Sequence, residues 1–358
     1  MDDIPEEFIR LNTFQKRLTA IILIVILGAG LSVGIFFYKR GPAKLTSEYY
    51  AMDTVMSITL ISTRDTDADL EVVDKQIMDR IYEVEKEMSV TMDGSDVDRL
   101  NFSSGEPVAV SRDTYRLLQR ALEIAEDTDG CFEPTIYPIV LLWGFTTGDY
   151  EVPDEASIKK ELKNVGYKRI HLLSGNIDSS GKIGATDTDD FVYVVRVDPG
   201  TKVDLGAIAK GFLSDELCDI MRSHHVNGIV SLGGNVQSVG TKEDGESFTV
   251  GITDPADPEK IYKRISSSDE AVVTSGNYER YFEQDGKIYH HIMDRRTGAP
   301  AENELASVTV RGPKGVYCDA YATALYVMGA DAAKAFAGKH PDYKVSLIYK
   351  DGTGYGFE

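Results

Sequence analysis

The chain has 358 residues, an ordinary proportion of hydrophobic residues and a formal net charge of -20 at pH 7. A chain of this length buries a full hydrophobic core without the help of disulfides or structural metals. Its acidic net charge argues against a nucleic-acid partner, because binding to phosphates requires clustered lysine and arginine. The cysteines Cys131, Cys218 and Cys318 are far apart and odd in number. We therefore expect buried thiols rather than a disulfide framework or a structural zinc site.

An uncharged apolar run occupies residues 18–38 near the N-terminus. As a helix it would extend roughly 30 Å, which matches the hydrocarbon thickness of a bilayer. We predict a short tail over 1–17, a transmembrane signal-anchor helix over 18–38 and a linker over 39–47. A cleaved signal peptide is the alternative, but the run is long for one and lacks a small-residue cleavage site. Basic residues flank both ends, so charge alone leaves the orientation open.

The folded domain is expected over residues 48–358. It opens with a β-branched, mostly apolar run at 49–62, which predicts a strand. After Asp69, apolar residues recur at spacings of three and four, as on one face of an amphipathic helix. The same pattern predicts a second helix with Ser111 as its N-cap and Gly130 beyond its end.

The second half of the chain contains one helical stretch at 156–166, a polar insertion at 176–190 and many short strand-like runs. Turn chemistry at Asp285-Gly286 predicts one hairpin, and residues 343–358 predict a terminal one. The remaining strand-like runs are residues 228–234, 247–252, 262–268 and 271–276. Because helices and strands alternate irregularly, we predict an α+β fold with mixed, largely antiparallel sheets and packed helices.

A first candidate site is the segment VDLGAIAKGF, residues 203–212. Gly206 and Ala207 allow another group to approach the backbone closely, and a helix starting near Ile208 would direct free N–H groups at an anion. Lys210 adds a point charge. The segment therefore predicts a phosphate-facing turn, with an ordinary strand-to-helix turn and a surface lysine as the alternative.

A second candidate is VYCDAYATALYVMG, residues 316–329. Asp319 and Thr323 are four residues apart, so on a helix they share a face. Both present oxygen, the ligand that hard cations such as magnesium prefer. The alternative is an aspartate that interacts with the helix dipole and a threonine that bonds back into its own turn.

A third candidate is YHHIMDRRTGAP, with His290 and His291 adjacent. Neighbouring residues of a strand point to opposite faces, so at most one of the two histidines looks into a given site. The turn at Gly233-Gly234, after a strand, offers either a simple turn or close approach of the backbone to a ligand.

Taken in order, seven segments resemble the ApbE family of flavin transferases over nearly all of residues 49–358. The segments are Met52-Asp53-Thr54, MSVTMDGSDVDRLN, GCFEPTIYP, VDLGAIAKG, SLGGN, HHIMDRRTG and CDAYATALYVMG. The resemblance implies an ApbE-like fold and an enzyme that uses FAD as substrate and Mg²⁺ to transfer FMN to a Thr or Ser hydroxyl of an acceptor flavoprotein, releasing AMP. Some members hydrolyse FAD to FMN and AMP, so an FAD pyrophosphatase is the alternative, and a non-catalytic flavin-binding surface protein is a third possibility.

The same resemblance implies residue roles. It assigns the magnesium ion to Asp319, Thr323 and the backbone carbonyl of Ala207, and catalysis to Lys210, Asp319 and His291. The general base is left open between Asp294 and His291. The residues implied to contact FAD are Met52, Thr91, Cys131, Phe132, Glu133, Asp204, Lys210 and Ile292.

The chain departs from the family pattern at several positions. Asp53 stands in place of a small glycine, Glu133 in place of an aspartate and Arg295 in place of a proline. None of these changes removes an implied metal ligand. Thr91 stands where many relatives have an aromatic residue, which leaves flavin stacking and the balance between transfer and hydrolysis open.

The resemblance also implies a location and a partner. We expect the catalytic domain outside the cytoplasmic membrane, tethered by residues 18–38, with an acceptor flavoprotein from an exported electron-transport complex. The Gly-Ala-Thr sequence that ends at Thr186 lacks the Ser or Thr that normally precedes it in acceptors. We therefore expect no self-modification at Thr186.

Overall fold

The computed structural model describes residues 43–63, 68–177, 183–184 and 191–357. The elements belong to one compact unit, Lys44–Glu358. The predicted transmembrane helix at 18–38 lies outside the described residues. Within the described ranges, none of the helices has the length and apolar character needed to cross a membrane.

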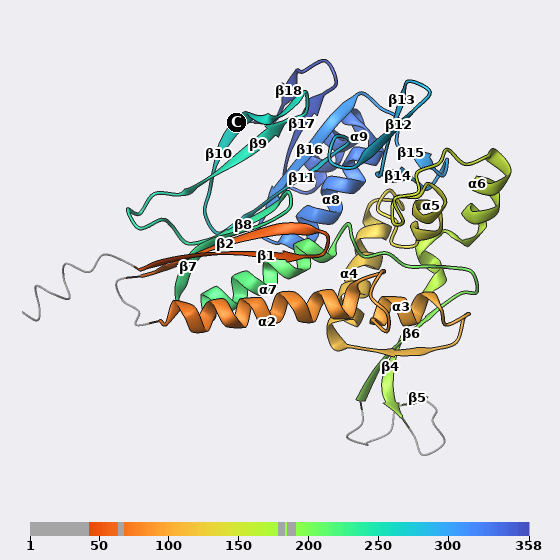
Figure 1. The fold of residues 1–358 in the computed structure, drawn as a ribbon, viewed down its shortest axis with the longest axis horizontal. Helices are drawn as coiled ribbons and strands as arrows, with labels where there is room; N and C mark the ends of the chain where they lie inside the picture. The colour runs from red at the N-terminus through yellow and green to blue at the C-terminus, as the bar shows by residue number, and fades with distance from the viewer. Residues whose placement is uncertain (1–42, 64–67, 178–182, 185–190, 358) are drawn as a thin grey trace, which may run out of the picture. The chain divides into compact units, whose positions relative to one another are not determined.

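Eight of the described strands form one large sheet, in which every pair of neighbours is antiparallel (Figure 1). The predicted α+β class with largely antiparallel sheets is confirmed. In spatial order the strands are β1 (Lys44–Ala51), β2 (Thr54–Ser62), β7 (Val226–Leu232), β8 (Asn235–Val239), β11 (Ala271–Gly276), β16 (Leu305–Gly312), β17 (Lys344–Tyr349) and β18 (Gly354–Tyr355).

The run predicted as a single strand at 49–62 is two strands, and the single-strand prediction is wrong. The chain reverses at Met52 and Asp53, whose φ angles are 51° and 57°. Two successive positive φ angles are the geometry of a tight hairpin turn, for which Asn-Gly or Asp-Gly is the usual signal. Because this turn contains no glycine, the sequence lacks the signal from which a hairpin turn is usually predicted.

Both predicted helix starts are confirmed. Asp69 accepts a hydrogen bond from Glu71 N at 3.1 Å, and Ser111 accepts one from Thr114 N at 3.0 Å. The stretch at 156–166 is helical only in part, and continues as short 3₁₀ turns at Leu162–Asn164 and Tyr167–Arg169. The α-helices are α2 (Leu70–Met88), α3 (Asp96–Asn101), α4 (Arg112–Asp127), α5 (Tyr137–Leu142), α6 (Glu155–Glu161), α7 (Ala209–Ser223), α8 (Gly315–Met328) and α9 (Ala330–Lys339).

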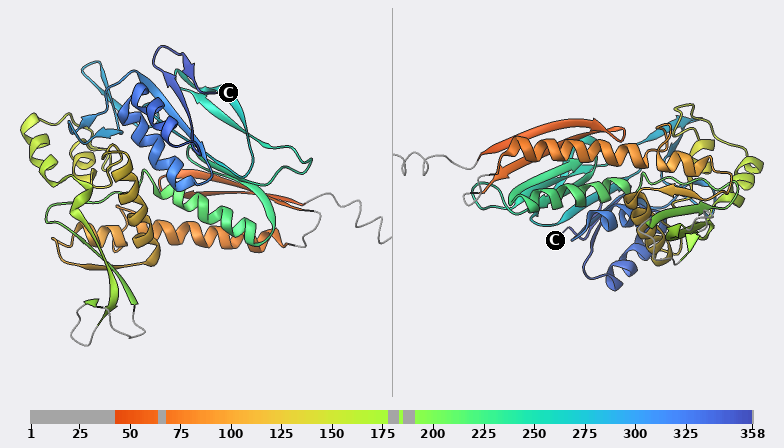
Figure 2. Two further views of the ribbon diagram at one scale, coloured as in Figure 1. Left: turned by 180° about the vertical axis from the view of Figure 1, so that it is seen from behind. Right: turned by 90° about the horizontal axis from the view of Figure 1, so that it is seen from below.

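Helices α2 and α7 pack against each other and against the large sheet, and α7 also packs along α8 (Figures 1 and 2). The apolar face of α2, with Val73, Ile77 and Ile81, meets the inward residues of the sheet in one continuous core. Helix α8 is buried on nearly all sides. The candidate segment at 203–212 therefore leads into α7, and the segment at 316–329 forms most of α8. These two helices cross in the interior.

Smaller antiparallel sheets complete the unit, and the predicted hairpins are confirmed at Asp285-Gly286, with φ angles of 53° and 76°, and at the C-terminus, where β17 pairs with β18. Most of the predicted insertion at 176–190, Thr186 included, lies outside the described residues. The small sheets consist of β3 (Val108–Val110), β6 (Phe191–Val197), β4 (Ile170–Ile177) and β5 (Ile183–Gly184); β9 (Phe248–Asp254) with β10 (Asp257–Ser267); β12 (Tyr281–Gln284) with β13 (Lys287–His290); and β14 (Met293–Asp294) with β15 (Ala299–Pro300).

Candidate functional site

The segment at 203–212 forms a turn followed at once by a helix. Helix α7 begins at Ala209 with Ile208 as its N-cap residue, as predicted to within a residue. Asp204 Oδ1 accepts a hydrogen bond from Gly206 N at 2.8 Å, and Lys210 Nζ donates to Gly206 O at 3.1 Å. The lysine ammonium group therefore folds back over the turn at the N-terminal end of α7, where helical N–H groups attract anions.

Asp319 lies on α8 with only 4% of its surface exposed. Its Oδ2 atom accepts a hydrogen bond from Gly211 N at 2.8 Å. Burial raises the pKa of the Asp319 carboxyl, and the nearby charge of Lys210 opposes that rise. One turn further along α8, Thr323 Oγ1 lies 3.1 Å from Ser275 Oγ of β11.

Two glycines explain how α7 and α8 come so close. A Cβ atom at Gly211 would lie 2.3 Å from Gly315 O and 2.7 Å from Asp319 Cβ. A Cβ atom at Gly315 would lie 2.2 Å from Ser214 Oγ. Since any larger residue would separate the helices, these glycines bring Asp319 next to the start of α7.

Lys210 is the electrostatic centre of the candidate site. Its charge acts on the carboxyl groups of Asp204, Glu279 and Asp319 and on the His291 ring, and in each case it lowers the pKa. Coulomb interactions with a partly exposed charge such as that of Lys210 are screened beyond roughly 10 Å, so all four groups lie close to this ammonium group. Residues from four separate sequence segments thus share one neighbourhood.

Glu279 was not foreseen from the sequence. Its side chain reaches solvent, and crowding by neighbouring protein atoms raises the pKa of its carboxyl; the charge of Lys210 lowers this pKa and that of Asp319 raises it. A Cβ atom at Gly234 would lie 3.4 Å from Glu279 Oε1. The Gly233-Gly234 turn is therefore next to the site, in line with the close-approach interpretation.

His291 is held by one backbone carbonyl. Its main-chain N donates to Arg280 O at 3.1 Å, and its ring Nδ1 lies 3.1 Å from the same oxygen. A carbonyl oxygen only accepts hydrogen bonds, so the ring proton is on Nδ1 and Nε2 keeps its lone pair. Desolvation lowers the pKa of His291 far below its usual range, and the charges of Arg280 and Lys210 lower it further. The imidazole is neutral at pH 7.

His290 points the other way, as the alternation rule predicts. It is buried, and its Nε2 lies 3.1 Å from Ala301 O. Asp294, the other candidate base, accepts hydrogen bonds from the Arg296 guanidinium on both oxygens at 2.7 to 3.0 Å. The geometry therefore favours His291 over Asp294 as a proton acceptor.

Three predicted FAD contacts have side chains that serve the fold. Glu133 is buried and accepts hydrogen bonds from Thr135 Oγ1 at 2.6 Å and from Tyr167 N at 3.0 Å, so both of its oxygens are engaged. The side chains of Phe132 and Ile292 belong to the hydrophobic core. Only the backbone of these residues is left for a ligand.

The other predicted FAD contacts stay predictions. Met52 N donates to Glu85 Oε1 at 2.6 Å, and Thr91 Oγ1 lies 3.1 Å from Ser89 Oγ in an exposed loop. Cys131 is partly buried, where desolvation raises the pKa of its thiol and the charge of Arg296 lowers it. Cys218 and Cys318 are buried thiols, as expected.

The residues at the crossing of α7 and α8 fit a hard cation. Asp319, Thr323 and the Ala207 carbonyl offer oxygen, the ligand type that magnesium binds. Asn235 is fully buried beside Asp319, where its side-chain amide lowers the pKa of the carboxyl. A buried carboxylate with a polar neighbour and a hydroxyl one turn along the same helix fits a hard cation.

The ApbE family model matches residues 52–347. The chain belongs to the ApbE family. The FAD:protein FMN transferase of Treponema pallidum is 35% identical over 288 residues, which is 77% of each chain. A relative of the same name from Klebsiella pneumoniae is 33% identical over 285 residues, 78% of this chain and 84% of the relative.

Solved ApbE structures agree with the fold. The ApbE protein of Thermotoga maritima matches with a TM-score of 0.77 and 31% identity, covering 88% of this chain and 97% of that one. The flavin transferase ApbE of Vibrio cholerae matches with a TM-score of 0.73 and 28% identity over the same shares. The resemblance stated from the sequence is confirmed.

Proposed function

We propose that this ApbE protein is an FAD:protein FMN transferase, which moves FMN from FAD to a Thr or Ser hydroxyl of an acceptor flavoprotein and releases AMP. The names of its relatives support the activity. The observation that carries it is the gathering of Lys210, His291 and Asp319 around the crossing of α7 and α8.

Lys210 and the start of α7 bind the pyrophosphate of FAD in this proposal. The ammonium group and the free N–H groups of the first helical turn offset the charge that develops on the leaving AMP phosphate. A magnesium ion held by Asp319, Thr323 and the Ala207 carbonyl would supply polarisation of the phosphoryl oxygens. Positioning and electrostatic stabilisation account for most of the catalysis in phosphoryl transfer.

His291 is the general base of the proposal. Its Nε2 lone pair accepts the proton of the acceptor hydroxyl as the hydroxyl oxygen bonds to the phosphorus of the FMN moiety. The bond between that phosphorus and the oxygen of the AMP phosphate breaks, and AMP leaves with the bridging oxygen. The Arg280 carbonyl keeps the proton on Nδ1 before the transfer and accepts the same hydrogen bond from the imidazolium that forms.

Hydrolysis of FAD is the second candidate, because the same base would activate water. The observation that favours it is Thr91, a small exposed side chain where the family resemblance leads us to expect an aromatic one. AMP release from FAD and Mg²⁺ by the full-length chain, with and without an acceptor domain that carries the Thr- or Ser-Gly-Ala-Thr sequence, separates the candidates. A transferase releases AMP only with the acceptor, a hydrolase releases it without, and a binding protein leaves FAD intact.

We also propose that the catalytic unit faces the outside of the cytoplasmic membrane, tethered by residues 18–38, and modifies an exported electron-transport flavoprotein. The apolar run and the family resemblance support this location. Protease added to intact spheroplasts should digest the catalytic unit while a cytoplasmic marker survives. Protection of the catalytic unit until the cells are lysed would contradict the proposal.

A further inference from the structure

Asp215 is a buried carboxylate on α7 that the proposed function does not use. Its oxygens accept hydrogen bonds from Gly315 N at 2.9 Å, Val316 N at 3.0 Å and Gln237 Nε2 at 3.0 Å. Gly315 and Val316 are the first two residues of α8, whose own N-cap residue, Lys314, makes no side-chain cap within the described structure. Helix α8 is therefore capped by a residue of another helix.

This cap lies one helical turn from the candidate site. On α7, Asp215 follows Gly211 by four residues, and on α8, Asp319 follows Gly315 by four. The two helices are thus joined at two successive levels, by Asp215 to Gly315 and by Gly211 N to Asp319 Oδ2. Ser214 lies between these levels and donates to Gly211 O at 2.9 Å.

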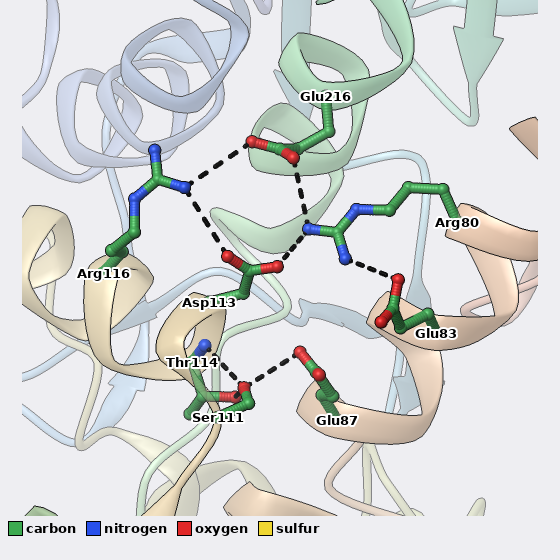
Figure 3. A network of polar contacts seen from close by, with 8 residues as sticks. All are labelled: Arg80, Glu83, Glu87, Ser111, Asp113, Thr114, Arg116 and Glu216. Carbon is green, nitrogen blue, oxygen red and sulfur yellow. Dashed lines mark hydrogen bonds and ion pairs between the residues drawn. The ribbon is translucent and has the colours of Figure 1, made fainter. Parts of the chain in front are cut away.

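The next residue of α7 is fixed to other helices (Figure 3). Glu216 pairs with Arg80 of α2 at 3.2 Å, and Arg80 also pairs with Asp113 of α4. The Arg80 side chain is only 12% exposed. Helix α7 is therefore anchored to α2 and α4 through Glu216. Because Asp215 binds the first residues of α8, α8 is fixed relative to the same helices.

We propose that Asp215 is a positioning residue that sets α8 in register along α7. Its cap holds Asp319 and Thr323 of α8 opposite the Ala207 carbonyl in the turn that precedes α7, so that α8 and this turn contribute to one cation site. The inference rests on the cation site of the proposed function. Metal ligands tolerate displacements of only about 0.2 Å, so a small slide of α8 weakens the site.

The substitution Asp215→Asn tests this role. The amide keeps the shape and one acceptor oxygen but turns an NH₂ group toward backbone donors. We expect the dissociation constant for Mn²⁺, used as a spectroscopic probe in the absence of FAD, to rise about tenfold or more, as for other residues that orient metal ligands. Electron paramagnetic resonance of free Mn²⁺ with the full-length protein measures it. The matched control is Asp219→Asn, on the same helix but in an exposed pair with Arg222, which should leave Mn²⁺ binding unchanged.

Wild-type and Asp319→Ala proteins separate failure of the inference from failure of the proposed function. Suppose that wild type binds Mn²⁺ and that Asp319→Ala does not. If folded Asp215→Asn then binds Mn²⁺ within twofold of wild type, the positioning role is overturned and the proposed function stands. If wild type does not bind Mn²⁺, both fall. Should Asp215→Asn not fold, Gln237→Met removes one donor to Asp215 from β8, and unchanged Mn²⁺ affinity in that variant overturns the positioning role.

Discussion

Two histidines adjacent in the sequence have different chemistry because their ring nitrogens have different neighbours. His291 is fixed by the Arg280 carbonyl with Nε2 free. His290 is packed edge-on against Tyr326, and its Nδ1 accepts from Ile292 N at 3.3 Å. Burial lowers the pKa of His290 to about 4. Burial lowers the pKa of both rings, but only His291 keeps a free Nε2, while both ring nitrogens of His290 are engaged within the fold.

His290 should make the protein less stable as the pH falls. Below about pH 6.5 the unfolded chain binds a proton at this histidine, while the folded chain does not until about pH 4. Between pH 7 and 5 this difference costs about 2 kcal/mol. In His290→Gln the amide still donates to Ala301 O but does not titrate, so the loss of unfolding free energy over this range should shrink by about that amount. Urea unfolding at both pH values measures it, and equal losses in both proteins would contradict the assignment.

Asp319→Ala should abolish metal-dependent turnover without unfolding the protein. The change removes a charged oxygen ligand, and several kcal/mol of transition-state stabilisation correspond to a fall of at least about 100-fold in rate. AMP release with Mg²⁺, together with circular dichroism, measures the two effects. The control is Asp331→Ala in the exposed first turn of α9, which should keep full activity. Activity of Asp319→Ala equal to that of the control would refute the ligand role.

At the scale of elements, the site depends on how closely α7 and α8 approach. Gly211→Ala places a methyl group against Gly315 O and Asp319 Cβ. Overpacking of this kind costs about 1 to 3 kcal/mol, and it should also weaken Mn²⁺ binding by separating the helices. Thermal and urea unfolding measure the cost.

The matched control is Gly338→Ala in α9, where a Cβ atom meets nothing within 4 Å. Alanine is the better helix former by roughly 0.5 to 1 kcal/mol, so this variant should be slightly more stable than wild type. If both alanine variants behave alike, the close approach at Gly211 does not constrain the helices.

The elements that could be predicted are those with a local signal. The helix start after Asp69, the cap at Ser111, the turn before α7 and the Asp285-Gly286 hairpin all follow from a few neighbouring residues. The β1–β2 hairpin could not be predicted, because Met52 and Asp53 adopt positive φ angles without a glycine.

The residues of the candidate site also fall into those that a sequence pattern marks and those that only tertiary packing brings together. Lys210, Asp319 and Thr323 stand in patterned segments, so the sequence alone predicts them as site residues. Asn235 ends the SLGGN segment, but no spacing in the sequence places it beside Asp319. Glu279 reaches the site through tertiary packing of the loop after β11, and no pattern in the sequence marks it. The role of Asp215 was equally hidden, since its partners Gly315 and Val316 lie 100 and 101 residues away.

At the scale of the whole unit, one ion-pair cluster holds three helices together (Figure 3). Arg80 of α2 meets Asp113 of α4 and Glu216 of α7, and Arg116 adds a second cation at 3.5 Å from Asp113 and 4.0 Å from Glu216. Glu83 also pairs with Arg80 at 2.8 Å, so the cluster contains three acidic and two basic groups. Glu87, next to it, has its carboxyl pKa raised by desolvation and by nearby carboxylates, although its hydrogen bond with Ser111 opposes the rise.

Arg80→Met should therefore destabilise the unit by about 3 kcal/mol, because it leaves the partly buried carboxylates of Asp113 and Glu216 with only the longer contacts to Arg116. Urea unfolding measures the loss. The control is Lys75→Met on the same helix, whose pair with Asp79 is exposed and should contribute less than about 1 kcal/mol. A loss for Arg80→Met no larger than for Lys75→Met would show that the cluster does not hold the helices together.

In the proposed reaction, residues at the crossing of α7 and α8 cleave the pyrophosphate of FAD and pass FMN to a protein hydroxyl. Intact-mass spectrometry of the acceptor domain, after incubation with the full-length chain, FAD and Mg²⁺, tests it most directly. We predict a mass increase of one FMN moiety on a Thr or Ser of the acceptor, and none with Asp319→Ala. An unmodified acceptor in the wild-type reaction, or equal modification by the Asp319 variant, would contradict the claim.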